Sequence, residues 1–292
     1  MGGRWREAAR GSQHRNGSFV KLTAPALRAI KRSGGATPLV MVTAYDEPGA
    51  RFASAAGVDI ILVGDSVGNV VLGFDDTLHV TVDDMVRHVA AVSRANPDAH
   101  IVGDMPWLSY HTGPEDAVRA AGRLIRAGAD SVKLEGGTNR LDVIRAIINA
   151  EIPVMGHIGL TPQSVLAMGG FKVQGKSRDA AAQLVADALA LQEAGIFGVV
   201  IEGVPPIVGA RLTEALSIPT IGIGAGPDTD GQVLVFHDLL GLSGRTPPKF
   251  VRTYADIGSQ ITDAIARYAA DVRGGEFPGP TETYANPAEL TD

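Results

Sequence analysis

Short, continuously apolar runs recur through the middle of this chain, each separated from the next by an interval long enough for a helix. The runs are rich in Val and Ile and are apolar at consecutive positions instead of at every second position. This pattern indicates strands that are buried on both faces of a parallel sheet. Parallel strands need crossover connections, which the intervals supply. The runs begin at Leu39, Asp59, Ile101, Asp130, Ile152, Phe197, Ile218 and Gln232.

Local signals between the runs predict where helices begin and end. Ser177 is expected to cap a helix that ends at Gly195, because Ser satisfies free backbone N–H groups and Gly accepts a left-handed conformation. Thr81 followed three residues later by Asp84 predicts a capping box. The Thr161–Pro162 pair predicts a further helix start. Strands and helices are therefore expected to alternate.

An internal repeat favours one architecture. The segments AAGVDIILVGDS (55–66), RAGADSVKLEGG (126–137) and EAGIFGVVIEGV (193–204) share Ala-Gly, two residues, an apolar run and an acid. Eight strands built from repeated strand–helix units predict an α/β fold, a single-domain (β/α)8 TIM barrel. A doubly wound sheet stays open as the alternative, although its G-x-G-x-x-G fingerprint is replaced by a shorter G-x-G-x-G at 222–226.

The domain boundaries follow from where the pattern stops. The catalytic barrel is expected over residues 21–273. Residues 1–20 and 274–292 are polar, are rich in Gly, Pro, Thr and Glu, and lack sustained periodicity. We expect them to be a flexible N-terminal extension and a polar C-terminal tail.

Composition and charge exclude several classes of function. Cysteine is absent, which excludes disulfides and thiolate metal sites and fits a cytoplasmic location. Lys and Arg number 26 against 32 Asp and Glu, and no stretch concentrates the basic residues, so nucleic acid is not an expected partner. No apolar run approaches the roughly 18 residues of a membrane span, and neither a signal peptide nor a membrane contact is expected.

Polar residues that end consecutive strands are the candidates for function, because all strand carboxyl ends of a barrel open on one face. Three of them, Asp65, Asp104 and Glu135, would repel one another in a shared pocket unless a cation lay among them. Carboxylate oxygens without thiols suit Mg²⁺, so we expect a magnesium-assisted reaction on an oxyacid. The full set of strand-end residues is Tyr45, Asp46, Asp65, Ser66, Asp104, Lys133, Glu135, His157 and Glu202.

Structural roles stay open for several of these residues. Lys133 can pair with Glu135, or it can supply the counter-charge for an anionic substrate. His157 can bond a backbone carbonyl instead of a ligand. Glu202 follows a buried run and can act as a general base, or it can form a structural salt bridge.

Several longer motifs resemble the ketopantoate hydroxymethyltransferase family, also called 3-methyl-2-oxobutanoate hydroxymethyltransferase. The resemblance runs in order from about Lys21 to Pro278. Its most specific parts are GHIGLTPQS (156–164) and IGIGAG (221–226) followed by DGQ (230–232), and it also includes VGDS (63–66), GDMPW (103–107), VKLEGG (132–137) and VIEGVP (200–205).

The resemblance implies a fold, a reaction and a set of roles. The fold is a barrel of the phosphoenolpyruvate/isocitrate-lyase-like superfamily, assembled as a homodecamer. The reaction moves a hydroxymethyl group from 5,10-methylenetetrahydrofolate to 3-methyl-2-oxobutanoate through an enolate stabilised by Mg²⁺, giving 2-dehydropantoate and tetrahydrofolate in pantothenate biosynthesis. The implied magnesium ligands are Asp65, Asp104 and, directly or through water, Glu135. The implied substrate contacts are Asp65, Ser66, Asp104, Lys133 and His157, and Glu202 is the implied proton acceptor.

Two other functions compete with this one. A magnesium-dependent C–C lyase or mutase of the same superfamily would use a similar enolate, but such lyases typically need a cysteine, and this chain has none. A non-catalytic oligomer that binds a 2-oxo acid would be marked by the loss of an active-site acid or of Lys133. No such loss is present.

Overall fold

The computed structural model describes residues 21–31 and 35–287. The predicted extension at 1–20 and the last residues of the predicted tail lie outside this range. Two compact units divide the chain, Met1–Phe236 and His237–Asp292. The range 21–273 expected for the barrel domain therefore includes residues of both units.

Eight parallel strands form a closed barrel in which each strand pairs with its neighbours along the chain. The pairing of β1 with β8, which sets Val40 opposite Gln232, closes the barrel. The predicted (β/α)8 fold is confirmed, and the doubly wound alternative is excluded because an open sheet has no such closing pair. The strands are β1 Leu39–Thr43, β2 Ile60–Val63, β3 His100–Asp104, β4 Ser131–Glu135, β5 Val154–Gly159, β6 Gly198–Glu202, β7 Thr220–Ile223 and β8 Gly231–Leu234.

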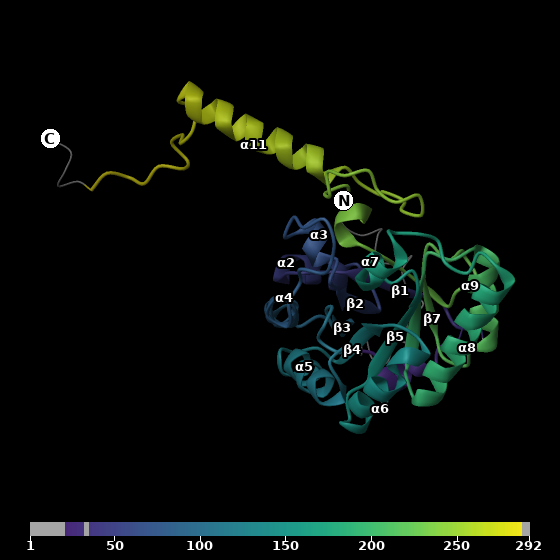
Figure 1. Cartoon of the computed structure of the whole chain (residues 1–292). Coiled ribbons are helices and arrows are strands. Elements are labelled where there is room, and N and C mark those ends of the chain that lie inside the picture. The colour runs from purple at the N-terminus through teal and green to yellow at the C-terminus, as the bar shows by residue number, and fades with distance from the viewer. Residues whose placement is uncertain (1–20, 32–34, 288–292) are drawn as a thin grey trace. The chain divides into compact units, whose positions relative to one another are not determined.

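Helices surround the strands of the first unit (Figure 1). Those that connect or follow the strands are α2 Glu47–Ala55, α3 Val67–Val70, α4 Val82–Arg94, α5 Pro114–Arg126, η2 Thr138–Arg140, α6 Leu141–Asn149, η3 Pro162–Ser164, α7 Val165–Met168, α8 Arg178–Ala194, α9 Pro206–Ala215 and α10 Phe236–Leu239, and α1 Ala24–Arg28 precedes β1.

The predicted helix caps are largely confirmed. Thr81 and Asp84 form the capping box of α4, and Ser177 caps α8, which ends at Gly195 in a left-handed conformation. The start predicted at the Thr161–Pro162 pair is only partly right. A short 3-10 turn begins there, the Thr161 side chain makes no capping bond, and only the four-residue helix α7 follows. Gln163 in this turn is instead hydrogen-bonded to Asp65 and Glu135.

Two hydrophobic clusters explain why the strands are continuously apolar. In β2, Ile61 and Val63 belong to the cluster packed against the helices, whereas Ile60 and Leu62 belong to the cluster that fills the barrel interior. Successive side chains of a strand point to opposite faces, so each strand buries one set outward and the other inward.

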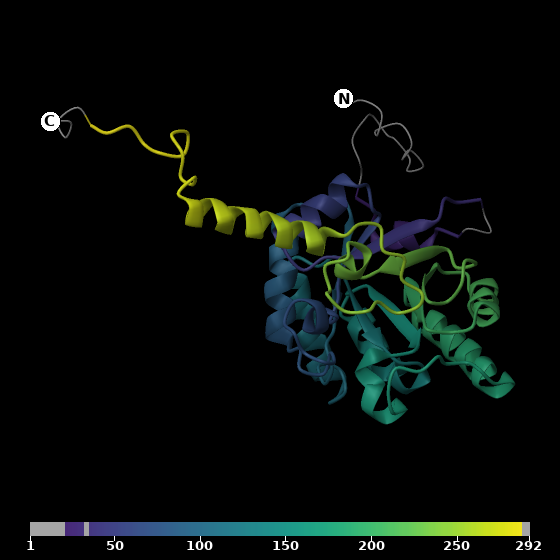
Figure 2. The same cartoon turned by 90° about the horizontal axis from the view of Figure 1, so that it is seen from above.

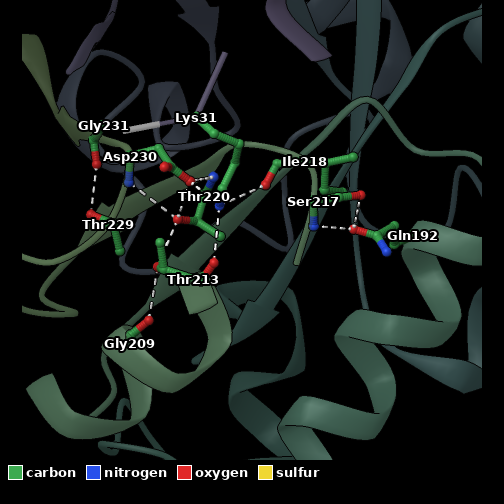
Figure 3. Close-up of polar contacts among 10 residues, drawn as sticks. All are labelled: Lys31, Gln192, Gly209, Thr213, Ser217, Ile218, Thr220, Thr229, Asp230 and Gly231. Carbon is green, nitrogen blue, oxygen red and sulfur yellow. Dashed lines mark hydrogen bonds and ion pairs between the residues drawn. The ribbon is translucent and has the colours of Figure 1, made fainter. Parts of the chain in front are cut away.

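The segment before β1 closes the amino end of the barrel. Leu27 of α1 is 1% exposed and packs into the interior cluster. Lys31 Nζ donates to Asp230 Oδ2 at 2.7 Å and to the backbone carbonyls of Thr213 and Ile218 (Figure 3). The Thr220 N–H and hydroxyl also donate to Asp230 Oδ2, at 2.9 and 3.0 Å. This amino-end cluster ties the start of the chain to β7 and β8.

The second unit contains one long helix, α11 Ile257–Gly274, which is uninterrupted in both views (Figures 1 and 2). Asp256 caps it by accepting from the Ser259 N–H, and none of its residues is buried. Its apolar side chains Ile261, Ile265, Tyr268 and Val272 are all exposed. Within the described residues, no helix is long and apolar enough to cross a membrane.

Candidate functional site

Inward-facing side chains of the strands form both the hydrophobic interior of the barrel and, at the carboxyl ends of the strands, the predicted site. Val102, Met155 and Val200 belong to the interior cluster. Because residues two apart in a strand share a face, the side chains two positions further along must also point inward, at the carboxyl ends of the same strands. Those residues are Asp104, His157 and Glu202.

Lys133 and Asp104 form a fully buried ion pair at this end. Strand register sets Asp104 opposite Lys133, and Lys133 Nζ lies 2.8 Å from Asp104 Oδ1. Burial raises the pKa of Asp104 to about 7, although the ammonium lowers it. Burial would lower the pKa of Lys133, but the surrounding carboxylates raise it above its ordinary value. Lys133 therefore carries the positive charge, and its ion-pair partner is Asp104 instead of Glu135.

Asp65 extends the acidic part of the site. Its backbone N–H donates to Asp104 Oδ2 at 3.1 Å, so the two residues are held in contact. Burial, together with the charge of Glu135, raises the pKa of Asp65, while Lys133 opposes the shift. Ionised Asp65 and Asp104 side by side would be costly without more positive charge than Lys133 supplies.

His157 links the two remaining acids. Register sets it opposite Glu135. Its Nδ1 lies 3.4 Å from Glu135 Oε1 and its Nε2 lies 3.2 Å from Glu202 Oε2. Burial and the Lys133 ammonium would lower the pKa of His157, but the bonds to both carboxylates raise it to about 9. The alternative of a bond to a backbone carbonyl is not what these contacts show: the ring lies between two carboxylates, and its Nδ1 is also 3.3 Å from Lys133 Nζ.

The two carboxylates that contact His157 differ in how much of each side chain is exposed to solvent. The Glu135 side chain is 2% exposed, and the Glu202 side chain is 15% exposed at the end of β6. Glu202 is therefore the acid of this pair that a ligand at the barrel mouth can reach. The structural alternative for Glu202, a salt bridge, is also present through His157, so the two interpretations of this residue are compatible.

Ser66 lies at the edge of this group of residues. Its hydroxyl is 2.9 Å from the Tyr45 hydroxyl, and its side chain does not cap α3. Asp46, which follows β1, accepts from the Gly49 N–H at 2.7 Å and so caps α2. The strand-end position of Asp46 thus has a structural role, whereas the Ser66 hydroxyl stays beside Asp65.

Sequence reasoning missed two buried residues that contact the acids. Gln163 Nε2 donates to Asp65 Oδ2 at 2.9 Å, and the Gln163 backbone N–H donates to Glu135 Oε2 at 3.0 Å. The Tyr110 hydroxyl donates to Gln163 Oε1 at 2.6 Å. Both residues lie in loops after strands, so the strand-end pattern could not find them. The only signal was the place of Gln163 within the GHIGLTPQS motif.

The donor set fits a magnesium ion held by few protein ligands. Among the residues that the structure describes, no three His, Asp or Glu side chains are grouped as a ready-made metal site. Mg²⁺ commonly takes one or two protein carboxylates and completes its shell with water and substrate oxygens. Asp65 and Asp104 supply such a pair, and Asp104 Oδ1 makes no directed hydrogen bond although it lies near Lys133.

The chain is similar to known proteins over nearly its whole length. The family model described as ketopantoate hydroxymethyltransferase matches residues 21–280. A 3-methyl-2-oxobutanoate hydroxymethyltransferase 2 of Bradyrhizobium diazoefficiens is 56% identical over 270 residues, covering 92% of this chain and 91% of the relative. The 3-methyl-2-oxobutanoate hydroxymethyltransferase of Moorella thermoacetica is 54% identical, covering 90% and 98%.

Solved structures with the same fold are more distant in sequence. A 2,3-dimethylmalate lyase described as a PEP mutase/isocitrate lyase superfamily member aligns with a TM-score of 0.57 at 17% identity, over 89% of this chain and 93% of the other. A phosphonopyruvate hydrolase complex with oxalate and Mg²⁺ aligns at 0.56 and 15% over the same shares. These likenesses support the fold. The family model and the close relatives show that the chain belongs to the ketopantoate hydroxymethyltransferase family.

Proposed function

We propose that this chain transfers a hydroxymethyl group from 5,10-methylenetetrahydrofolate to 3-methyl-2-oxobutanoate and so produces 2-dehydropantoate and tetrahydrofolate. The observation that carries the proposal is the group of three buried acids and the partly exposed Glu202 around Lys133 and His157, at the carboxyl end of a barrel that belongs to this family. Water supplies the new hydroxyl group overall, which balances the reaction.

Asp65 and Asp104 would hold Mg²⁺, with Glu135 contributing directly or through a water molecule. Glu135 Oε2 accepts from the Gln163 backbone N–H, whereas Oε1 makes no directed hydrogen bond although it lies 3.4 Å from His157 Nδ1, so this second oxygen is the one that could contribute. When bound, the ion would polarise the keto group of the oxo acid and make its C3 proton more acidic. Its charge would also offset the cost of ionising Asp65 and Asp104, whose pKa values are raised first by burial and then by neighbouring carboxylates.

Lys133, Ser66 and His157 would bind and orient the oxo acid. The Lys133 ammonium is held rigidly by Asp104, so it offers a preorganised positive charge to a carboxylate or to a developing enolate oxygen. The Ser66 hydroxyl can donate to a substrate oxygen beside Asp65. Protonated His157 can donate to the keto oxygen or to the new hydroxymethyl group.

Glu202 would remove the C3 proton. Its carboxylate is the more accessible of the two that contact His157, and the contact of Glu202 Oε2 with His157 Nε2 at 3.2 Å orients it. The electron pair of the C3–H bond moves into the enolate, and the proton goes to Glu202. C3 then forms a bond to the methylene carbon of the folate as one of the two bonds from that carbon to folate nitrogens breaks. Water replaces the second carbon–nitrogen bond, which leaves the hydroxymethyl group on C3, and its protons go to the nitrogens of the released tetrahydrofolate.

The two competing functions have weaker support. The lyase and mutase structures share only the fold, at under 20% identity. Relatives that share more than half of their residues with this chain carry the transferase name instead. A non-catalytic 2-oxo-acid-binding oligomer would not need the acids, Lys133 and His157 to be kept together in one site. A cytoplasmic location, a homodecamer and the domain ranges 1–20, 21–273 and 274–292 stay predictions.

The C3 proton of 3-methyl-2-oxobutanoate gives the most direct test. Its NMR signal would be followed in deuterated buffer with protein and Mg²⁺, with chelator, and finally with methylenetetrahydrofolate. We expect magnesium-dependent loss of the signal and then formation of 2-dehydropantoate. Exchange without product would contradict the folate half-reaction, and the absence of both would contradict the proposed function.

A further inference from the structure

Gln163 is buried and makes hydrogen bonds to several groups around the acids of the site. The residue is 4% exposed and lies at the start of the loop after β5. Its side-chain NH₂ donates to Asp65 Oδ2 at 2.9 Å and to the Met105 carbonyl at 3.0 Å, and its backbone N–H donates to Glu135 Oε2 at 3.0 Å. One residue therefore fixes one oxygen on each of two carboxylates.

These bonds leave the Gln163 amide only one orientation. Both of its N–H donors are used, and its carbonyl oxygen accepts from the Tyr110 hydroxyl at 2.6 Å. A rotation by 180° would turn that oxygen toward the Asp65 carboxylate and the Met105 carbonyl, so two hydrogen bonds would be replaced by repulsion between acceptors, and the NH₂ group would face the Tyr110 hydroxyl. The amide can serve only as a donor to Asp65.

Tyr110 holds this orientation from the opposite side. Its side chain is 1% exposed, and its hydroxyl accepts from the Glu135 backbone N–H at 3.2 Å while it donates to Gln163. The Arg140 guanidinium lies over the ring, 5.6 Å from its centroid. Burial raises the pKa of Tyr110 well above its ordinary value, which keeps the hydroxyl proton available for Gln163.

We propose that Gln163, oriented by Tyr110, is a positioning residue that directs the Asp65 and Glu135 carboxylates for magnesium binding. This inference rests on the proposed function. The mechanism above uses neither side chain, because neither lies among the strand-end residues that would contact the ion or the oxo acid. Outer partners that orient metal ligands commonly change metal affinity 10- to 100-fold when they are removed.

The two carboxylates proposed to hold magnesium, Asp65 and Asp104, are oriented by different groups. Asp104 is oriented by Lys133 and by the Asp65 backbone N–H. Asp65 and Glu135 instead share Gln163. Loss of the Gln163 side-chain amide should therefore leave the Lys133–Asp104 pair and the backbone N–H bond to Glu135 intact, and it should let the Asp65 carboxylate rotate.

The test compares two variants with a matched control in the full-length protein. Gln163→Met keeps the length of the side chain but removes its amide, and Tyr110→Phe removes only the hydroxyl. Gln192→Met removes an amide at the other end of the barrel, where Gln192 Oε1 accepts from the Ser217 N–H and hydroxyl (Figure 3). Calorimetric titration of the substrate-free proteins with Mg²⁺, and Mn²⁺ titration followed by electron paramagnetic resonance, would measure metal affinity.

We expect metal Kd to rise at least tenfold in Gln163→Met, to rise by a smaller factor in Tyr110→Phe, and to stay unchanged in Gln192→Met. The double variant should bind metal no more weakly than Gln163→Met, since both act through one amide. Excess Mg²⁺ should restore much of the turnover of Gln163→Met, which a purely structural defect would not allow.

Three outcomes would overturn the inference. If the wild type binds Mg²⁺ and both variants match its Kd, Gln163 and Tyr110 have no positioning role and the proposed function still stands. If Gln163→Met fails to fold, a Tyr110→Phe protein with wild-type metal affinity is equally decisive. If the wild type binds no Mg²⁺ even with 3-methyl-2-oxobutanoate, the metal part of the proposed function is wrong as well.

Discussion

The two ends of the barrel both bury charged side chains, but they differ in how the charges are balanced. At the amino end, Lys31 faces Asp230, and Thr220 completes the bonds to the carboxylate. At the carboxyl end, four acids face one lysine and one histidine, and burial raises the pKa of both Asp65 and Asp104.

This difference distinguishes a structural polar cluster from the proposed functional site. A buried ion pair with hydrogen-bonded partners holds segments together, as Lys31 does for the start of the chain and β8. A group with surplus negative charge costs stability until a ligand of opposite charge arrives. The surplus at the carboxyl end matches the charge of the divalent cation that we propose for this site.

The largest expected effect is at Glu202. Glu202→Gln removes the proposed base, so C3 proton exchange should fall about 10³-fold, roughly 4 kcal/mol in activation free energy. Mg²⁺-dependent binding of the oxo acid should persist. The His157 imidazole also loses a carboxylate partner, so its pKa should fall from about 9, which an NMR titration of the ring would detect. Unchanged exchange would exclude Glu202 as the base.

At the amino end, substitution should act on stability alone. Asp230→Asn leaves the Lys31 ammonium, which is 16% exposed, without its counter-charge. We expect the free energy of unfolding to fall by about 3 kcal/mol, the low end for a broken buried pair because Lys31 is partly solvated. Denaturant unfolding measures this loss, and the double variant with Lys31→Met should recover part of it. A parallel loss of turnover per folded molecule would contradict the structural role.

Substitution of Asp65 is expected to raise the free energy of unfolding, whereas substitution of Asp230 should lower it. The raised pKa of Asp65 means that the folded protein binds this proton more tightly than the unfolded chain does, so its contribution to stability is lost as pH rises through the folded pKa. Asp65→Asn removes that cost and can still accept from Gln163. In magnesium-free buffer at pH 7 the variant should gain about 1 kcal/mol in unfolding free energy while metal affinity falls. A loss like that of Asp230→Asn would show that Asp65 is structural.

The smallest effect concerns His100 at the amino end. Its Nδ1 contacts the Leu22 carbonyl at 2.8 Å and its Nε2 the Ser131 hydroxyl at 2.9 Å, and burial lowers its pKa below 6.5. The unfolded chain therefore binds the proton more tightly, so stability falls as pH drops below 6.5. His100→Asn should reduce the stability lost between pH 8 and pH 5 by about 1 kcal/mol. Equal losses in both proteins would refute this assignment.

The fold and most of the candidate site followed from local patterns. Continuously apolar runs and the repeat of Ala-Gly, strand and acid predicted the barrel, and strand ends placed Asp104, His157 and Glu202 on one face. The structure corrected their partners. Lys133 pairs with Asp104 because the register between β3 and β4 sets them opposite each other, and no pattern along the chain encodes the register between two strands.

Loops and long-range contacts escaped prediction for a related reason. The contact between Tyr110 and Gln163 joins the loops after two strands that are not neighbours in the barrel. Lys31 and Asp230 are in contact although they are 199 residues apart in the sequence. Thr161 has the residue type of a helix cap but makes no capping bond. A local signal states what a residue can do and does not state which group it will meet.

The amino-acid sequence alone set the spacing of apolar residues, the alternation of strand and helix, and the residue types at the strand ends, because these depend on backbone geometry over a few residues. Closure of the barrel decided that Lys133 pairs with Asp104, that the acids of the site outnumber its cations, and that the Gln163 amide lies against Asp65. Those outcomes depend on distances of a few ångströms between residues far apart in the chain, and such distances exist only once all eight strands are joined.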